Sequence, residues 1–153
     1  MLDIPRTFAL LMAVSLIGFV GCKDDSPLSA VESANSTNIQ KLSNLYNQFQ
    51  ADNGLVGPSS EEEFRDYIAN GVPDFLKERI NLAPDDDIFV SERDGKPFKI
   101  RFEIPTDGRG CNAPAIFEAE GVGGKFMVGF LNMNTREVEQ NEYQDLWDGK
   151  EDS

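Results

Sequence analysis

The sequence predicts an α+β fold in which N-terminal helices pack on one face of a small antiparallel β-meander. Two patterns predict it. Apolar residues recur at three- and four-residue steps over residues 39–49, which is typical of an amphipathic helix. In residues 98–104 apolar and polar side chains alternate, which is typical of a half-buried strand. Because the helical patterns precede the strands, we expect one layer of helix on one layer of sheet.

Three helices are expected before the strands. Asn53-Gly54 supplies the stop of the first helix. The second begins at Ser59-Ser60, where Ser60 and Glu63 form a capping box. Pro73 opens the third helix. This third helix is expected to run through Phe75, Leu76 and Ile80 toward Leu82.

Five strand segments are expected, at residues 88–90, 98–104, 115–120, 125–131 and around Val138. Asp94-Gly95 is typical of a hairpin turn between the first two segments. The turn over residues 132–135 leads to the last segment. Leu146 and Trp147 are expected to dock on the domain before the acidic C-terminus frays.

The composition excludes several classes of function. The 153 residues include 27 acidic and 14 basic side chains and no histidine, and the formal net charge is −13. Serine–histidine and cysteine–histidine nucleophile pairs, histidine metal sites and histidine pH switches therefore cannot form. The negative charge repels nucleic acid, so no nucleic-acid partner is expected.

The N-terminal region has the pattern of an export signal. Residues 8–20 carry no charge and form a run too short for a membrane-spanning helix, which needs about 20 residues. This run ends in Phe19-Val20-Gly21-Cys22, which resembles the lipobox of bacterial lipoproteins. The resemblance implies cleavage between Gly21 and Cys22, a diacylglycerol thioether on Cys22 and a further acyl chain on the new amino terminus. An ordinary signal peptide, or a buried N-terminal helix with an incidental cysteine, is the alternative.

This interpretation divides the chain into three parts. Residues 1–21 are a lipoprotein signal peptide that is removed, residues 22–36 are a polar tether, and residues 37–153 are a single α+β domain. The membrane is then a partner through the lipidated Cys22. The expected location is extracytoplasmic, lipid-anchored at the cell membrane or the outer membrane. Cys111 is the remaining thiol of the mature chain and is expected to be structural.

The order of elements also resembles the globular head of type II secretion pseudopilins. Two segments carry this resemblance: Leu45-Tyr46-Asn47-Gln48-Phe49 leading to Asn53-Gly54, and Glu92-Arg93-Asp94-Gly95-Lys96-Pro97-Phe98. The resemblance implies a pilin-like head on a lipid anchor. Pseudopilins assemble through a retained hydrophobic helix with a glutamate near its start. Residues 8–20 contain no glutamate, so fibre assembly is not expected.

Carboxylates are the abundant reactive groups of the chain. Asp85, Asp87 and Asp94 are the candidates for a Ca²⁺ site, but apolar residues 88–90 interrupt the alternating ligand pattern of a calcium loop. Solvated loop charges are therefore expected instead of a metal site. A paired-carboxylate hydrolase needs a cleft that spacing cannot show. With no catalytic motif in the sequence, we expect neither an enzyme nor a cofactor.

The charge is unevenly distributed along the chain. Residues 52–94 carry 12 acidic and 4 basic side chains, whereas residues 95–131 carry 4 acidic and 5 basic ones. A sheet face around Lys99, Arg101 and Lys125 is therefore the candidate interaction face for anionic material. The expected function is a structural or interaction module, of a secretion-accessory kind, with an envelope protein as partner. The alternative is a periplasmic ligand- or Ca²⁺-binding lipoprotein.

Overall fold

The computed structural model describes residues 36–105 and 112–150. Five helical segments are present there: α2 (Asn38–Asp52), α3 (Glu61–Asp66), η1 (Tyr67–Gly71), α4 (Asp74–Arg79) and α5 (Gln140–Trp147). The strands are β1 (Lys99–Ile100), β2 (Pro114–Phe117), β3 (Lys125–Phe130) and β4 (Thr135–Glu139). The strands form one antiparallel sheet in the order β1-β2-β3-β4, so the predicted α+β fold with a meander is confirmed. The predicted signal peptide, Gly21, Cys22, most of the tether and Cys111 lie outside the described residues.

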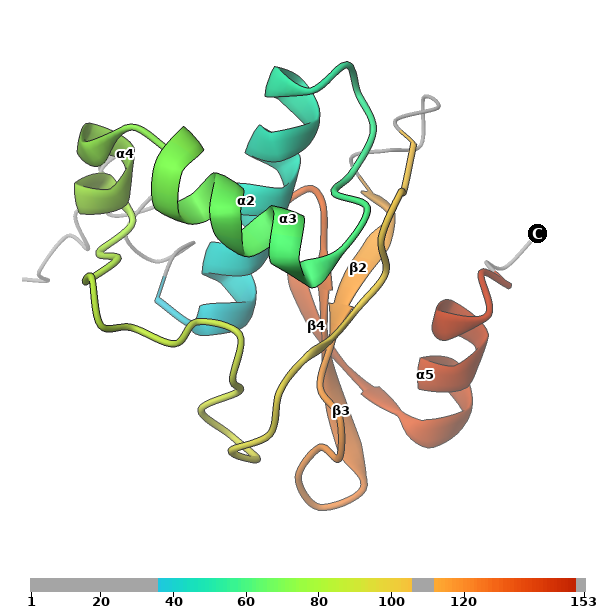
Figure 1. Ribbon diagram of the computed structural model, residues 1–153. Helices are drawn as coiled ribbons and strands as arrows, with labels where there is room; N and C mark the ends of the chain where they lie inside the picture. The colour runs from blue at the N-terminus through green and yellow to red at the C-terminus, as the bar shows by residue number, and fades with distance from the viewer. Residues whose placement is uncertain (1–35, 106–111, 151–153) are drawn as a thin grey trace, which may run out of the picture.

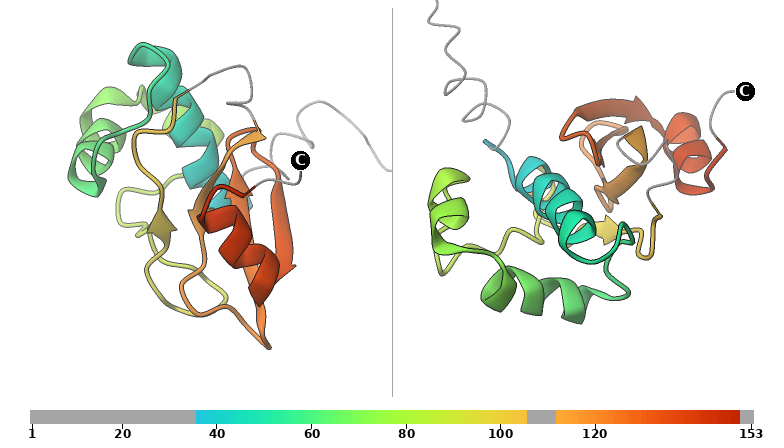
Figure 2. Two further views of the ribbon diagram at one scale, coloured as in Figure 1. Left: turned by 90° about the vertical axis from the view of Figure 1, so that its right-hand side faces the viewer. Right: turned by 90° about the horizontal axis from the view of Figure 1, so that it is seen from above.

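The N-terminal helices lie on one face of the sheet, as predicted, and the C-terminal helix α5 covers the other face (Figure 1). Seen from above, α2 lies between the sheet and the layer of α3, η1 and α4, and α5 lies beyond the sheet (Figure 2). The reason is visible in β2, because all four of its residues are buried. Ile116 faces α2, and Phe117, its neighbour in the pleat, faces α5. A strand that is apolar on both faces needs a cover on each.

Helix α2 is the centre of the larger core. The backbone N–H of its N-cap, Thr37, donates to Gln40 Oε1 at 3.2 Å, and the helix ends at Asn53-Gly54 as predicted. Gly54 takes a φ of +74° there, which glycine adopts without strain. The helix crosses β3 so closely that a Cβ on Gly129 would lie 2.5 Å from Ser43 Oγ. A glycine at this position therefore lets helix and sheet approach.

The helical layer outside α2 is held by Phe64 of α3. Its ring is fully buried and meets the rings of Tyr46, Phe49 and Phe89 edge-on, with centroids 5.6, 6.4 and 5.7 Å away. Each such pair adds stabilisation to the apolar burial itself. The predicted Ser60–Glu63 cap is formed in one direction only. Ser60 Oγ accepts from the backbone N–H of Glu63 at 3.2 Å, while the Glu63 carboxylate accepts from Ser59.

The predicted third helix is present as α4, but one of its large apolar side chains faces solvent. Phe75 is 69% exposed. Leu76 and Ile80, one turn apart, face the core instead, and Phe75 lies about 100° around the helix from Leu76. Phe75 therefore lies outside the row that packs against the core.

Two of the predicted strands form few of the backbone pairs that make up the sheet. Residues 88–90 form turns with a single bridge between Val90 and Pro97, and the strand expected at 98–104 pairs only at Lys99 and Ile100. The chain leaves the sheet because Glu103 takes a φ of +56° and its N–H donates to Pro58 O at 2.9 Å. Phe98, Ile100 and Ile104 are buried as the alternation predicts, whereas Phe102 is only half-buried. An irregular segment can thus bury alternate side chains without a partner strand.

The other predicted pairings are confirmed. β2 pairs with β3, and β3 pairs with β4 across the turn at residues 132–135. On the second face, Leu146 is buried and the Trp147 ring meets Phe117 at 5.1 Å, so both residues dock as expected. Tyr143 completes this contact, with its ring 5.4 Å from that of Phe117.

Candidate interaction site

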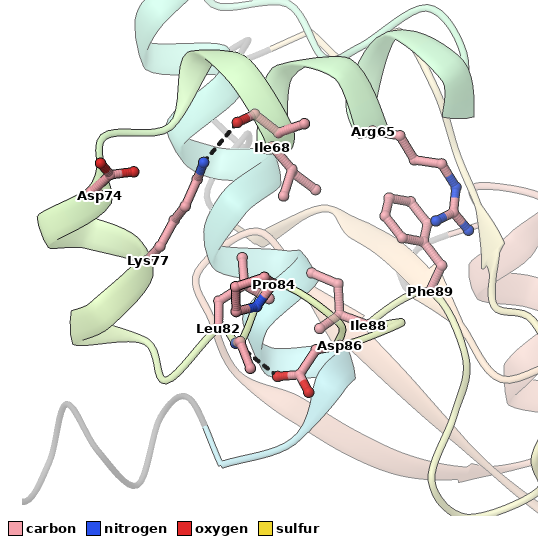
Figure 3. Close-up of a pocket in the computed structure, with 11 residues that line it drawn as sticks. Arg65, Ile68, Asp74, Lys77, Leu82, Pro84, Asp86, Ile88 and Phe89 are labelled. Carbon is pink, nitrogen blue, oxygen red and sulfur yellow. Dashed lines mark hydrogen bonds between the residues drawn. The ribbon is translucent and has the colours of Figure 1, made fainter.

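A groove of about 390 Å³ opens between the helical layer and the loop of residues 82–89 (Figure 3). Its walls come from α3, η1, α4 and this loop. Five large apolar side chains line the groove: Ile68, Leu82, Pro84, Ile88 and Phe89. The volume lies within the range of pockets that bind small molecules or side chains, roughly 300–1,000 Å³.

Local backbone geometry holds the two sides of the groove apart. The wide turn of η1 closes with the Val72 N–H donating to Tyr67 O at 3.0 Å, and this turn sets the angle between α3 and α4. On the other side, Lys41 Nζ donates to Asn81 O at 2.8 Å and fixes the start of the loop to α2. Asp86 accepts from the Ala83 N–H at 3.0 Å, which closes the loop's own turn.

The two cations at the groove already have partners inside the chain. The Arg65 guanidinium lies 3.8 Å from the centre of the Phe89 ring and pairs with Glu61 at 2.7 Å and Asp87 at 3.4 Å. Lys77 Nζ donates to Ala69 O at 2.7 Å. Figure 3 shows both cations turned along the walls. The groove therefore has an apolar floor, and its charged lining residues are two basic and two acidic side chains: Arg65, Lys77, Asp74 and Asp86.

The three aspartates that the sequence offers as Ca²⁺ ligands have different roles in the loops and do not form one site. Asp87 accepts from the Phe89 N–H at 3.3 Å and pairs with Arg65. Asp85 is exposed on the same loop. Within residues 36–105 and 112–150, no three acidic side chains come together as a group that could hold a metal ion.

Asp94 joins two turns. Its carboxylate accepts from the backbone N–H groups of Lys96 at 2.9 Å, Glu120 at 3.1 Å and Gly121 at 3.0 Å. Burial raises the pKa of this carboxyl, but these three bonds to the ionised form outweigh it and leave the pKa below its ordinary value. Asp94 therefore links the 94–95 turn to the turn that follows β2 by hydrogen bonds.

The structure divides the predicted interaction face of Lys99, Arg101 and Lys125 between two faces of the sheet. Lys99 Nζ lies 5.8 Å from the Tyr143 ring on the α5 side. Arg101 donates to Leu146 O at 3.4 Å, at the carbonyl end of α5 where a cation is favoured. Lys125 lies one position before Phe126 on β3, hence on the α2 side, and pairs with Glu137 at 3.5 Å. An open face shared by the three cations is not formed, because α5 covers one side.

Sequence reasoning missed the buried carboxylate of Glu118, which is 1% exposed. It accepts from Ser91 Oγ at 2.8 Å and from the Met127 N–H at 2.7 Å, and Arg93 lies 3.6 Å away. Arg93 also pairs with Glu137 at 2.8 Å. The signal for this cluster was a single acid directly after the apolar run of β2. The donors and the guanidinium hold Glu118 in a structural role, joining the 91–94 segment to the sheet.

We find no match for this chain among protein-family models, curated proteins or solved structures. Of the helices in the described ranges, none combines the length and the apolar character needed to cross a membrane. The groove in Figure 3 is the candidate interaction site, because its lining combines large apolar side chains with two basic and two acidic ones.

Proposed function

We propose that this chain is a bacterial lipoprotein, anchored outside the cytoplasm through Cys22, whose α+β domain is a structural or interaction module of the cell envelope. The observation that carries the proposal is the sequence Phe19-Val20-Gly21-Cys22 at the end of an uncharged apolar run. Two or three acyl chains hold a protein on a bilayer stably, since each buried CH₂ contributes about 0.8 kcal/mol.

The position of the domain supports this proposal. Helix α2 begins at Asn38, and residues 23–37 between it and Cys22 are mostly polar or small. Even fully extended, such a segment reaches about 50 Å at 3.3–3.6 Å per residue. The domain is thereby kept within reach of partners at the same membrane, while its negative charge opposes contact with anionic lipid.

We further propose a pilin-like head, without fibre assembly, in a secretion-accessory role. The support is the order of elements: one long helix, α2, then the short segments α3, η1 and α4, and then an antiparallel meander that opens after Asp94-Gly95. Fold analogy by itself assigns no activity. The alternative, a periplasmic ligand- or Ca²⁺-binding lipoprotein, stays a prediction.

The anchor is tested by metabolic labelling with radioactive palmitate in a bacterial host. We expect the wild type and Cys111→Ala, the matched control, to carry label and to sediment with membranes. Cys22→Ala should lose both. Mass spectrometry of the mature N-terminal peptide should find acylated Cys22, and a labelled Cys22→Ala chain or an unmodified peptide that starts elsewhere overturns the proposal.

A further inference from the structure

We propose that Asn53-Gly54 is a site of spontaneous deamidation, with water as the co-reactant, and that the folded structure protects Asn70-Gly71 from the same reaction. The sequence contains these two Asn-Gly pairs. Both asparagines are exposed to solvent, so exposure alone does not separate them. The backbone around each pair does. This modification does not depend on the lipid anchor of the proposed function.

The reaction needs only the pair itself and water. The Gly54 backbone nitrogen loses its proton to solvent and attacks Asn53 Cγ, so that an N–Cγ bond forms. The Cγ–Nδ2 bond then breaks, the side-chain nitrogen takes up a proton and leaves as ammonia, and a succinimide ring remains. Water adds to one of the two ring carbonyls and opens the ring, which gives aspartate or isoaspartate. Glycine favours the attack because it has no side chain and leaves the backbone free to rotate.

At Asn53-Gly54 the backbone is free to make the rotation that this attack requires. Asn53 is the C-cap of α2, with φ −122° and ψ 38°, so it lies beyond the last helical residue. Within the described residues, the Gly54 N–H has no hydrogen-bond acceptor, and no described atom lies within 4 Å of the place where a Gly54 Cβ would be. The Asn53 side chain is held by the bond from Nδ2 to Phe49 O at 2.9 Å. Helix ends open at little cost in free energy, so this restraint is weak.

Asn70-Gly71 lies inside a helical turn instead. Both residues belong to η1, which closes with the Val72 N–H donating to Tyr67 O at 3.0 Å. A Cβ on Gly71 would lie 2.6 Å from Tyr67 Cδ2, so the tyrosine ring packs against this glycine. Asn70 Nδ2 donates to Asp66 Oδ1 at 2.7 Å, and a bond to a carboxylate is stronger than one to a neutral carbonyl. The turn must open before the Gly71 nitrogen can reach Asn70 Cγ, which makes the attack rarer.

Deamidation at position 53 would weaken the end of α2. The product carries a negative charge beside Asp52 and the last carbonyl groups of the helix, where the helix dipole disfavours an anion. A carboxylate also has no N–H to donate, so the bond to Phe49 O is lost. Residues 56–58, which pair with residues 103–105, follow directly. The modification should therefore loosen the last turn of α2 and its connection to this segment.

The test follows the purified full chain during incubation at mildly alkaline pH in water labelled with heavy oxygen. Peptide mapping by mass spectrometry measures the products at both asparagines, and the label marks deamidation that took place during the incubation. We expect Asn53 to react about tenfold faster than Asn70, or more, because η1 must open first. In urea, where neither helix end nor turn persists, the two rates should become similar.

A matched pair of variants tests the consequence for α2. Asn53→Asp reproduces the aspartate product and should speed hydrogen exchange in the last turn of α2 about threefold or more. Asn141→Asp is the control, because it adds the same charge in the first turn of α5, where the helix dipole favours it. Its helix should exchange no faster than in the wild type.

Three results overturn the proposed site: no labelled product at position 53, equal rates at both asparagines in the folded chain, or an Asn70 that stays slow in urea. The last result would place the cause in the neighbouring residues of the sequence. Unchanged hydrogen exchange in Asn53→Asp overturns the consequence for α2. The palmitate experiment is independent of all of these, so a failure of the lipid anchor and a failure of the deamidation site are told apart.

Discussion

The two faces of the sheet are covered in different ways. The α2 face is part of a large core that continues through α2 to Phe64 and Phe89, so the covering helix is itself covered. The α5 face has a smaller core, closed by the eight residues of α5, whose outer side meets solvent. The difference teaches that the fold depends on α2 and its outer layer, and that α5 closes an otherwise exposed apolar surface.

Polar contacts strengthen this contrast. Side chains of α2 bond to the irregular segment that follows β1: Tyr46 Oη donates to Arg101 O at 2.9 Å, and Gln50 Nε2 donates to Ile104 O at 2.7 Å. These bonds satisfy carbonyl groups that a strand partner would otherwise satisfy. On the other face, aromatic contacts hold α5 together with the bond from Tyr143 Oη to Glu118 O at 2.8 Å. Two arginines add contacts at its surface: Arg101 donates to Leu146 O at 3.4 Å, and Arg136 of β4 pairs with Glu142 at 2.9 Å.

The largest expected effect is at Phe64. Phe64→Ala removes a fully buried ring between α2, α3 and Phe89, and should lower the free energy of unfolding by about 3–5 kcal/mol. Urea denaturation followed by circular dichroism measures it. Phe75→Ala, on an exposed ring, is the control and should change stability by less than about 0.5 kcal/mol. A small effect at Phe64 would contradict the central role of the α2 side.

A smaller effect is expected at Trp147. This side chain is half-buried against Phe117, so Trp147→Ala should lower the free energy of unfolding by about 1–2 kcal/mol. Hydrogen exchange should become faster in α5 while α2 keeps its protection, because the loss falls on the smaller core. Equal acceleration in both helices would remove the distinction between the two faces.

The smallest effect is expected at Asp94 and depends on pH. Its pKa in the folded state lies below the ordinary value of 3.8, so its hydrogen bonds stabilise the ionised form. The stabilisation is present at pH 7 and is lost as the pH falls below about 4 through the folded pKa. Asp94→Asn should therefore have a lower free energy of unfolding than the wild type at pH 7, and the difference between the two should decrease toward pH 3.

Denaturant midpoints at the two pH values measure this change. Asp85→Asn, at an exposed position of the neighbouring loop, is the control for the loss of one charge. Its denaturant midpoint at pH 7 should differ little from that of the wild type. If the midpoints of Asp94→Asn and the wild type differ by the same amount at pH 7 and pH 3, the effect of the substitution does not come from the ionisation of Asp94, and the prediction is wrong.

The sequence by itself determined the elements whose signals are local. The period of residues 39–49 and the Asn53-Gly54 stop gave α2, and the turn at residues 132–135 gave the β3–β4 hairpin. Burial of Leu146 and Trp147 could be expected from their apolar character in an acidic tail. These features depend on residues close in the chain, so periodicity and turn chemistry suffice to predict them.

Only the tertiary structure decided which alternating segments become strands, which face α5 covers and where the groove opens. Residues 98–104 alternate as a strand does, yet Glu103 bonds to Pro58 and the chain leaves the sheet. The groove combines Ile68 with Leu82 and Ile88, and the Glu118 cluster combines Ser91 with Met127. Such contacts join residues far apart in the chain, and their geometry is set by how the layers pack rather than by any local pattern.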